Sequence, residues 1–377
     1  MNIERPAIPS FQPPVRTLMG PGPSDVPPRV LSALARPTVG HLDPRFVGMM
    51  DELKTLLRYV FQTRNELTFP VSGPGSLGME TCFVNLVSPG DKVIVCVNGV
   101  FGGRMVENVH RLGATPVIVE DAWGTPVDPA KVEDAFKANP DARLFAFVHA
   151  ETSTGALSDA ATLAAIARRY DALTIMDCVT SLGGVPVLLD EWGIDAAYSG
   201  SQKCLSCTPG LSPVSFSEAA VARIRARTAP CPSWFQDLGL VLGYWSGAKR
   251  TYHHTAPVNP LYGLHEALVI LAEEGLEAAW QRHRDNHLRL AAGLHKLGLD
   301  FVVCEDARLP QLNTVWVPQG VDEAAGRTRL LNEFGLEIGA GLGALAGKVW
   351  RIGLMGHSSR PANIALCLAA LETVIGG

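Results

Sequence analysis

Between residues 68 and 216 the chain alternates short apolar runs with longer segments in which apolar residues recur at helical spacing. The runs at 92–97, 115–119, 144–149, 173–177 and 196–198 are apolar at almost every position, which is typical of strands buried on both faces of a parallel sheet. Strands that alternate with helices form βαβ units. The pattern therefore predicts an α/β fold with a mostly parallel central sheet wrapped by helices.

The pattern changes on both sides of this region. Prolines recur near the N-terminus and break any helix there, so residues 1–20 are expected to form an extended arm. A helix is expected at 45–61, directly after Asp43-Pro44.

Beyond residue 260 the chain changes character again. A long helical stretch at 261–297, short runs at 301–304 and 314–317, and a last helix at 360–375 indicate a smaller α+β domain. We therefore divide the chain into an arm at 1–20, a large domain at 21–260 and a small C-terminal domain at 261–377.

Composition narrows the class of protein. At 377 residues the chain is longer than a usual single domain. Its 47% hydrophobic and 18% charged residues suit a globular enzyme, and its net charge of -5 argues against a nucleic-acid binder. No apolar stretch reaches the roughly 20 residues of a membrane span, and residues 1–6 lack the apolar core of a signal peptide. We expect a cytoplasmic protein.

The eight cysteines are scattered, and most lie among apolar residues, where a reduced thiol behaves as a small hydrophobe. Cys204 and Cys207 have the spacing of a redox or metal pair, but no second pair completes a zinc set. His253 and His254, if they lie in a strand, point to opposite faces and cannot easily share one metal. We expect no metal site.

Two residues at predicted strand ends carry the sharpest chemical signal. Asp177 closes the run at 173–177, and Lys203 follows the run at 196–198 after a short stretch of Gly and Ser. In an open α/β sheet such ends face the ligand crevice. A carboxylate and an amine held there could pair with the ring nitrogen and the aldehyde carbon of pyridoxal phosphate. The plainer interpretations are a helix cap for Asp177 and a surface lysine for Lys203.

Other segments end at the same edge. The glycine-rich turn at 71–78 opens a helix whose first amides could bind a phosphate. The segment at 98–104 includes Phe101, which could lie flat on an aromatic cofactor, and the run at 149–155 is polar. Arg351 lies in a strand-like run that could hold its guanidinium rigidly against a carboxylate. Each also has a structural interpretation: a plain turn, a core ring, a polar loop, an exposed strand arginine.

Together these segments resemble the class V aminotransferase family of fold-type I pyridoxal phosphate enzymes, and most closely its alanine:glyoxylate and serine:pyruvate members. The resemblance covers nearly the whole chain. It is carried by the motifs GPGPS at 20–24, YVFQTRN at 59–65, STG at 153–155, SGSQK at 199–203, YHHT at 252–255 and GKVWRIG at 347–353.

The resemblance implies how the cofactor is held. Lys203 would form a Schiff base with pyridoxal phosphate, and Asp177 would pair with the pyridinium nitrogen. Gln202 and the amides of Gly75 and Ser76 would bind the phosphate.

It also implies roles outside this set. Thr152 would lie near the phenolic oxygen of the cofactor, and Arg351, with Gly20 nearby, would bind the substrate carboxylate. Tyr252 and Thr255 would reach the phosphate of the neighbouring subunit, which implies a homodimer with shared active sites.

Two residues depart from the alanine:glyoxylate pattern. Phe101 stands where those enzymes carry tryptophan, so the ring stack should be smaller. Pro74 stands where they offer a serine, and because proline has no N–H, one hydrogen bond to the phosphate would be lost.

The function implied is a ping-pong transamination through the Lys203 Schiff base, from a small amino acid (alanine or serine) to glyoxylate or pyruvate. An alternative is (S)-ureidoglycine:glyoxylate or serine:glyoxylate transamination, in which His41 and Asn259 would line the donor pocket. Both side chains could instead bind only loop backbone groups.

A different class is a pyridoxal phosphate lyase like the cysteine desulfurases, for which Cys304 is the one candidate nucleophile. A non-enzymatic binding module is disfavoured because Lys203, Asp177 and Arg351 are all present.

Overall fold

The computed structural model describes residues 3–245 and 250–376, and its largest sheet has seven strands in the order β2-β10-β9-β8-β5-β3-β4. In chain order these are β2 (Leu67–Val71), β3 (Lys92–Val97), β4 (Thr115–Glu120), β5 (Leu144–Val148), β8 (Leu173–Asp177), β9 (Ala196–Tyr198) and β10 (Ser212–Phe216). The predicted α/β fold is confirmed, and each predicted strand of this region lies within one residue of its observed bounds.

The direction of the strands decides where polar ends meet. Strands β9, β8, β5, β3 and β4 pair in parallel, whereas β10 runs antiparallel to both of its neighbours. Asp177 pairs with Val148 on one side and with Tyr198 on the other. The carboxyl ends of β5, β8 and β9 therefore lie together at one edge of the sheet.

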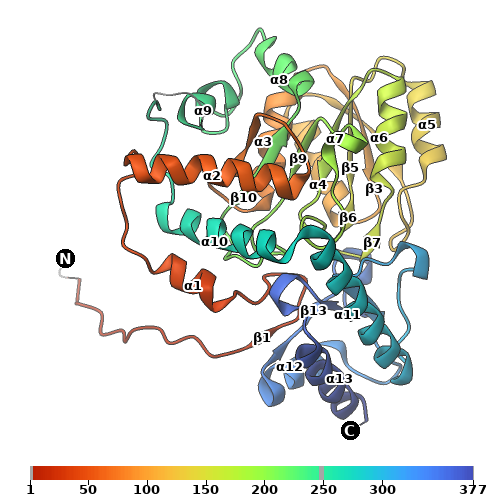
Figure 1. The fold of residues 1–377 in the computed structure, drawn as a ribbon. Helices are drawn as coiled ribbons and strands as arrows, with labels where there is room; N and C mark the ends of the chain where they lie inside the picture. The colour runs from red at the N-terminus through yellow and green to blue at the C-terminus, as the bar shows by residue number, and fades with distance from the viewer. Residues whose placement is uncertain (1–2, 246–249, 377) are drawn as a thin grey trace.

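Helices surround this sheet (Figure 1). Asp43 caps the second helix by accepting a hydrogen bond from the Arg45 amide, as the sequence predicts. The helices are α1 (Pro28–Leu34), α2 (Pro44–Phe61), α3 (Gly75–Leu86), α4 (Val100–Arg111), α5 (Pro129–Ala138), α6 (Ala160–Arg169), α7 (Leu189–Trp192), α8 (Glu218–Arg225), α9 (Leu238–Trp245) and α10 (Val258–Glu274). A short hairpin, β6 (Ala150–Glu151) with β7 (Ala156–Leu157), follows β5.

The C-terminal part forms a second hydrophobic cluster, which lies below the large sheet in Figure 1. Its sheet has the order β11-β14-β13. The elements are α11 (Leu276–Lys296), β11 (Leu312–Trp316), α12 (Glu323–Phe334), β12 (Leu336–Glu337), β13 (Gly339–Ala340), β14 (Val349–Gly353) and α13 (Pro361–Gly376). The first cluster extends through α10 to Ala279, and α10 packs on α1 and α2. The domain boundary at residue 260 stays a prediction.

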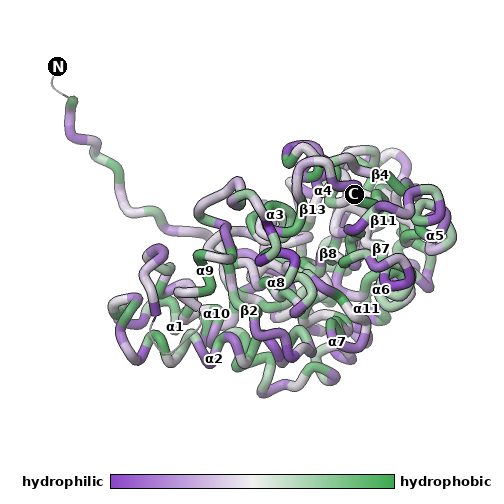
Figure 2. The backbone as a smooth tube through the Cα atoms, turned by 90° about the horizontal axis from the view of Figure 1, so that it is seen from above, coloured by the Kyte–Doolittle hydropathy of each residue, from purple (hydrophilic) through white to green (hydrophobic). Residues whose placement is uncertain are grey.

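The start of the chain joins the two parts. Residues 3–16 run away from the body in both views (Figures 1 and 2). Strand β1 (Thr17–Leu18) then pairs with β12, and Met19 is buried in the second cluster. The next residues contact the loop that carries Lys203: the Ser24 hydroxyl donates a hydrogen bond to the Lys203 carbonyl at 2.8 Å.

Two predicted elements differ from the structure. The helix expected at 261–297 is two helices, because Gly275 between them has φ +85°, a left-handed conformation that interrupts helical geometry. The strand expected at 301–304 is reduced to a single bridge between Phe301 and Val315, after which the chain bends. Among the described residues, no helix is both long and apolar enough to span a bilayer.

Candidate active site

A cavity of about 210 Å³ opens at the carboxyl edge of the large sheet. Seven residues that the sequence assigned to the cofactor line it, and they come from α3, α4, the β6 turn, β8 and the loop after β9. These residues are Gly75, Ser76, Phe101, Thr152, Asp177, Gln202 and Lys203. Tyr198, Val179, Pro74, Met79 and Arg104 complete the lining.

Asp177 lies at the end of β8 and is only 3% exposed. Its carboxylate accepts hydrogen bonds from the Val179 amide and from the Tyr198 hydroxyl, each at 2.8 Å. Burial raises the pKa of Asp177 from 3.8 to about 7, against the opposing effects of these hydrogen bonds and of Lys203. The site therefore contains a carboxylate whose charge is costly until a cation lies beside it.

Lys203 is held against the start of the chain. Its Nζ donates a short hydrogen bond to the Pro21 carbonyl. Burial, with a smaller contribution from the charge of Arg351, lowers the pKa of Lys203 from 10.5 to about 8. A substantial fraction of the amine is thus neutral near pH 8, and only the neutral amine can act as a nucleophile or base.

The N-terminus of α3 faces the same cavity. Gly75 and Ser76 are its first two residues, and Pro74 precedes them without providing a side-chain cap. The Gln202 side chain also lines the cavity, and its buried Oε1 has no hydrogen-bond partner within residues 3–245 and 250–376. The free amides at the start of α3 form a site that suits an anion, to which Gln202 can contribute only through its Nε2 donor, since Oε1 is an acceptor.

Arg351, in β14, does not itself line the cavity but is hydrogen-bonded to Thr152, which does. Its Nε donates to the Ala340 carbonyl at 2.6 Å, and its Nη1 donates to the Thr152 carbonyl at 2.9 Å. Burial lowers the pKa of Arg351 to about 10, with Glu151 opposing the change. Gly20 lies beside this strand, because a Cβ added at Gly353 would lie 1.9 Å from the Gly20 carbonyl oxygen.

The other predicted residues lie elsewhere. Tyr252 is 65% exposed, and Thr255 is also exposed. The Nδ1 atom of His41 lies 3.0 Å from the Tyr244 hydroxyl. The Asn259 side-chain amide donates to the carbonyls of Leu34 and Arg36, and its oxygen accepts from the Thr38 hydroxyl. Both ends of this amide are therefore already hydrogen-bonded within the chain.

Comparison with known proteins agrees with this geometry. The sequence model of the family described as aminotransferase class-V matches residues 18–357. The chain belongs to this family. It is therefore a pyridoxal phosphate-dependent aminotransferase of fold type I.

Relatives of the family match over nearly their whole length. An (S)-ureidoglycine–glyoxylate transaminase of Bacillus subtilis is 38% identical, over 96% of this chain and 91% of that protein. An alanine–glyoxylate aminotransferase of Drosophila melanogaster is 40% identical, over 96% and 93%. The crystal structure of an alanine–glyoxylate aminotransferase from Nostoc sp. superposes with a TM-score of 0.97 at 45% identity, covering all of both chains.

The cavity of this aminotransferase suits its cofactor. The first amides of α3 match a phosphate, the Nε2 group of Gln202 in the same lining can add a donor, and Phe101 offers an apolar ring surface. The carboxylate of Asp177 matches a ring cation, and the Lys203 amine can reach an aldehyde from the same lining. Each chemical part of pyridoxal phosphate thus has a matching group.

The sequence missed several residues in this aminotransferase site. Tyr198, Pro21 and Glu151 each contact a predicted site residue, yet none had been assigned a role. For Tyr198 a signal existed, because it ends the strand beside Asp177. The assumption that His253 and His254 lie in a strand is wrong: residues 252–255 form a loop, and the two Nδ1 atoms lie 2.8 Å apart.

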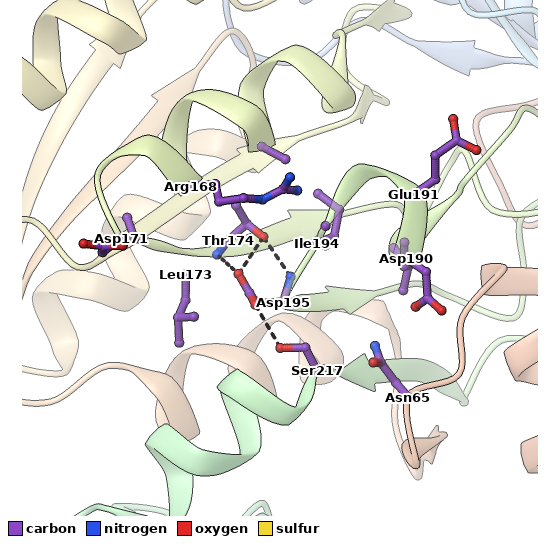
Figure 3. Close-up of a pocket in the computed structure, with 14 residues that line it drawn as sticks. Asn65, Arg168, Asp171, Leu173, Thr174, Asp190, Glu191, Ile194, Asp195 and Ser217 are labelled. Atoms are coloured by element: carbon purple, nitrogen blue, oxygen red, sulfur yellow. Dashed lines mark hydrogen bonds between the residues drawn. The ribbon is translucent and has the colours of Figure 1, made fainter.

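A larger cavity, of about 550 Å³, lies at the opposite edge of the aminotransferase sheet (Figure 3). It surrounds Asp195, which precedes β9 and accepts hydrogen bonds from the Thr174 amide and from the hydroxyls of Thr174 and Ser217. These bonds tie the amino ends of two strands to α8. The larger cavity is thus lined by hydrogen bonds that stabilise the fold, and it lies at the other end of the strands from Asp177 and Lys203.

Proposed function

We propose that this aminotransferase moves the amino group of a small amino acid, alanine or serine, to glyoxylate or pyruvate. The observation that carries the proposal is that Lys203 lines one cavity together with the buried carboxylate of Asp177, while the charge of the buried Arg351 guanidinium also acts on its amine. The relatives named as alanine–glyoxylate aminotransferases support the choice of substrates.

Lys203 is the proposed catalytic residue. Its Nζ would hold the cofactor covalently, and as a free amine it would take a proton from the Cα of the donor and later return one. The lowered pKa supports both roles, because the amine can exchange protons near neutral pH. Bound pyridoxal phosphate supplies the electron sink that makes this Cα proton acidic.

The remaining contacts of the cofactor are assigned by type of group. Asp177 is proposed to hold the pyridinium, and the amides of Gly75 and Ser76 with Gln202 to bind the phosphate. Pro74 offers no N–H at this turn, so the phosphate would depend more on its other donors. Phe101 is proposed to stack on the ring, and Thr152 to lie near the phenolic oxygen.

Arg351 is proposed to bind the substrate carboxylate, with the Gly20 backbone beside it. Two backbone carbonyls hold Arg351 through Nε and Nη1, so its Nη2, which has no partner among the described residues, remains free to bind a carboxylate. Replacing Arg351 by Lys keeps the charge but loses the planar fork. We expect KM for alanine to rise at least tenfold or so, with the cofactor still bound.

A homodimer with shared sites is proposed because Tyr252 and Thr255 lie exposed and outside their own chain's cavity. The arm supports it, since Ile8 and Phe11 are 81% and 84% exposed and would be buried by a partner. Mixing the variants Lys203→Ala and Tyr252→Ala tests the sharing. A hybrid with shared sites regains one intact site and activity, whereas sites built within one chain regain none.

We also propose a cytoplasmic location, supported by the unpaired thiols of the described chain, most of them buried.

The donor is tested with a panel of alanine, serine and (S)-ureidoglycine against glyoxylate and pyruvate. Preference for ureidoglycine would instead favour the activity named for the Bacillus subtilis relative. Cysteine as substrate tests the lyase alternative: Cys304 is exposed beside a short helical turn, and release of sulfide would favour it. We expect transamination of alanine or serine without sulfide release.

A further inference from the structure

Helix α4, which carries Phe101, lacks a cap of its own. Its N-cap residue is Gly99, which has no side chain that could accept a hydrogen bond, and its first turn contains no acidic residue. The first amides of a helix need acceptors, and these normally come from a Ser, Thr, Asp or Asn at the N-cap. Here the acceptors come from a turn some 50 residues later in the chain.

Two side chains of that turn supply the cap. The Ser153 hydroxyl accepts from the Val100 amide at 3.0 Å, and one carboxylate oxygen of Glu151 accepts from the Phe101 amide at 3.3 Å. The other Glu151 oxygen accepts from the Ser153 amide at 2.9 Å and from its hydroxyl at 2.6 Å. Gly99 permits this approach, because a Cβ there would lie 2.4 Å from the Glu151 Cδ.

The Glu151 side chain is fully buried, a position in which a charged group is costly unless it is hydrogen-bonded. Burial raises the pKa of Glu151, while its hydrogen bonds with Ser153, Phe101 and Gly102 lower it. A buried carboxylate at the positive end of a helix is stabilised there by these bonds and by the helix dipole.

The same turn also reaches two other parts of the site. Thr152 lies between the capping residues, and its carbonyl accepts from Arg351 Nη1, while its hydroxyl is hydrogen-bonded to Thr180. One short segment therefore fixes the start of the helix that carries Phe101, the wall at Thr152 and the guanidinium of Arg351.

We propose that Glu151 is a positioning residue, whose carboxylate caps α4 from outside the helix and thereby holds the Phe101 ring at the wall of the cofactor cavity. The inference rests on the proposed stacking of Phe101 on the cofactor. Glu151 itself does not line the cavity, so its effect on the cofactor is transmitted through the backbone of residue 101.

The variant Glu151→Gln tests this with little change of shape. An amide has one acceptor oxygen instead of two, so in either orientation an NH₂ group faces a buried N–H of Phe101 or of Ser153. The matched control is Glu107→Gln, which changes an exposed glutamate on the same helix that pairs with Arg111. If Glu151→Gln does not fold, the variant Ser153→Ala takes its place as the test, because it removes the acceptor of the Val100 amide.

The measurements are the dissociation constant of pyridoxal phosphate from the apoenzyme and the circular dichroism of the bound cofactor, which reports how its ring is held. For Glu151→Gln we expect the dissociation constant to rise about tenfold or more and the cofactor band to weaken, with Glu107→Gln unchanged. In combination with Phe101→Leu, the two losses should not multiply, because both act through one ring.

Unchanged binding and an unchanged band in Glu151→Gln overturn the inference, and so do losses that multiply in the double variant. For Ser153→Ala the same signs are expected with a smaller loss. A failure of the proposed substrates would instead leave cofactor binding by the wild-type protein intact and show only in turnover, so the two failures are distinguishable.

Discussion

Replacing Asp177 by Asn should stabilise the apoenzyme at alkaline pH while impairing the enzyme with its cofactor. The side chain of Asn matches a protonated Asp in shape, and it can keep the hydrogen bond from the Val179 amide. What it removes is a buried negative charge, which has no cation hydrogen-bonded to it in the described chain.

The magnitude follows from the pKa of Asp177. The unfolded chain loses this proton near pH 3.8, whereas the folded apoprotein keeps it to about pH 7. Between those values the folded state binds the additional proton, so wild-type stability falls as pH rises, and the loss is complete above pH 7. At 1.36 kcal/mol per pH unit the loss is about 2 kcal/mol at pH 5 and about 4 kcal/mol at pH 8. Asn has no such loss.

Denaturant unfolding of the two apoproteins, followed by tryptophan fluorescence, measures this difference across pH 5 to 8. Asp177→Asn should gain about 2–3 kcal/mol on wild type over that range, because the loss accumulates at 1.36 kcal/mol per unit between pH 5 and pH 7. With cofactor bound the order should reverse, because the ring cation loses its partner, and turnover should fall about 100-fold or more. Parallel pH profiles for the two apoproteins, or a less stable variant at pH 8, would refute the reasoning.

Three further predictions concern other residues. Gly22→Ala should lower kcat about tenfold or more in steady-state assays, since φ is +107° and the added Cβ would lie 2.6 Å from Lys203 Nζ; normal turnover would contradict it. The rate of cofactor uptake by the apoenzyme should rise about tenfold per pH unit below pH 8 and then level off, because only the neutral Lys203 amine reacts and its pKa is about 8. A rate that does not change with pH would show that deprotonation of Lys203 does not limit uptake. Gly326→Ala should lower the melting temperature, because the added Cβ would lie 2.6 Å from Trp350 Cζ2 in the second cluster. Such overpacking costs about 1–3 kcal/mol of stability, which outweighs the gain of about 1 kcal/mol from replacing Gly in a helix. An unchanged or higher melting temperature would show that Trp350 can move.

The fold was largely predictable because the strands of a parallel sheet are apolar throughout. The observed bounds of β3 (92–97), β8 (173–177) and β9 (196–198) equal those predicted. The errors arose where a local signal was weaker. Gly275 could have been recognised as a helix end, whereas the apolar run at 301–304 gave no sign that only Phe301 would pair.

The candidate site was predictable only in part. Asp177 and Lys203 stand at strand ends, and their positions follow from the sheet. The contact of Lys203 with Pro21 joins residues 182 positions apart, and no periodicity reports such a contact. Glu151 lies in a polar run, but its role as a cap depends on where α4 begins in space. Contacts of this kind are set by tertiary packing.

Reduction with borohydride, followed by peptide mass analysis, tests the central claim most directly. Borohydride converts a Schiff base into a stable secondary amine and so marks the lysine that carries the cofactor. The account predicts one pyridoxyl-modified peptide, with the modification on Lys203, and loss of both the visible absorbance and transamination in Lys203→Ala. Modification of another lysine, or turnover that survives Lys203→Ala, would contradict it.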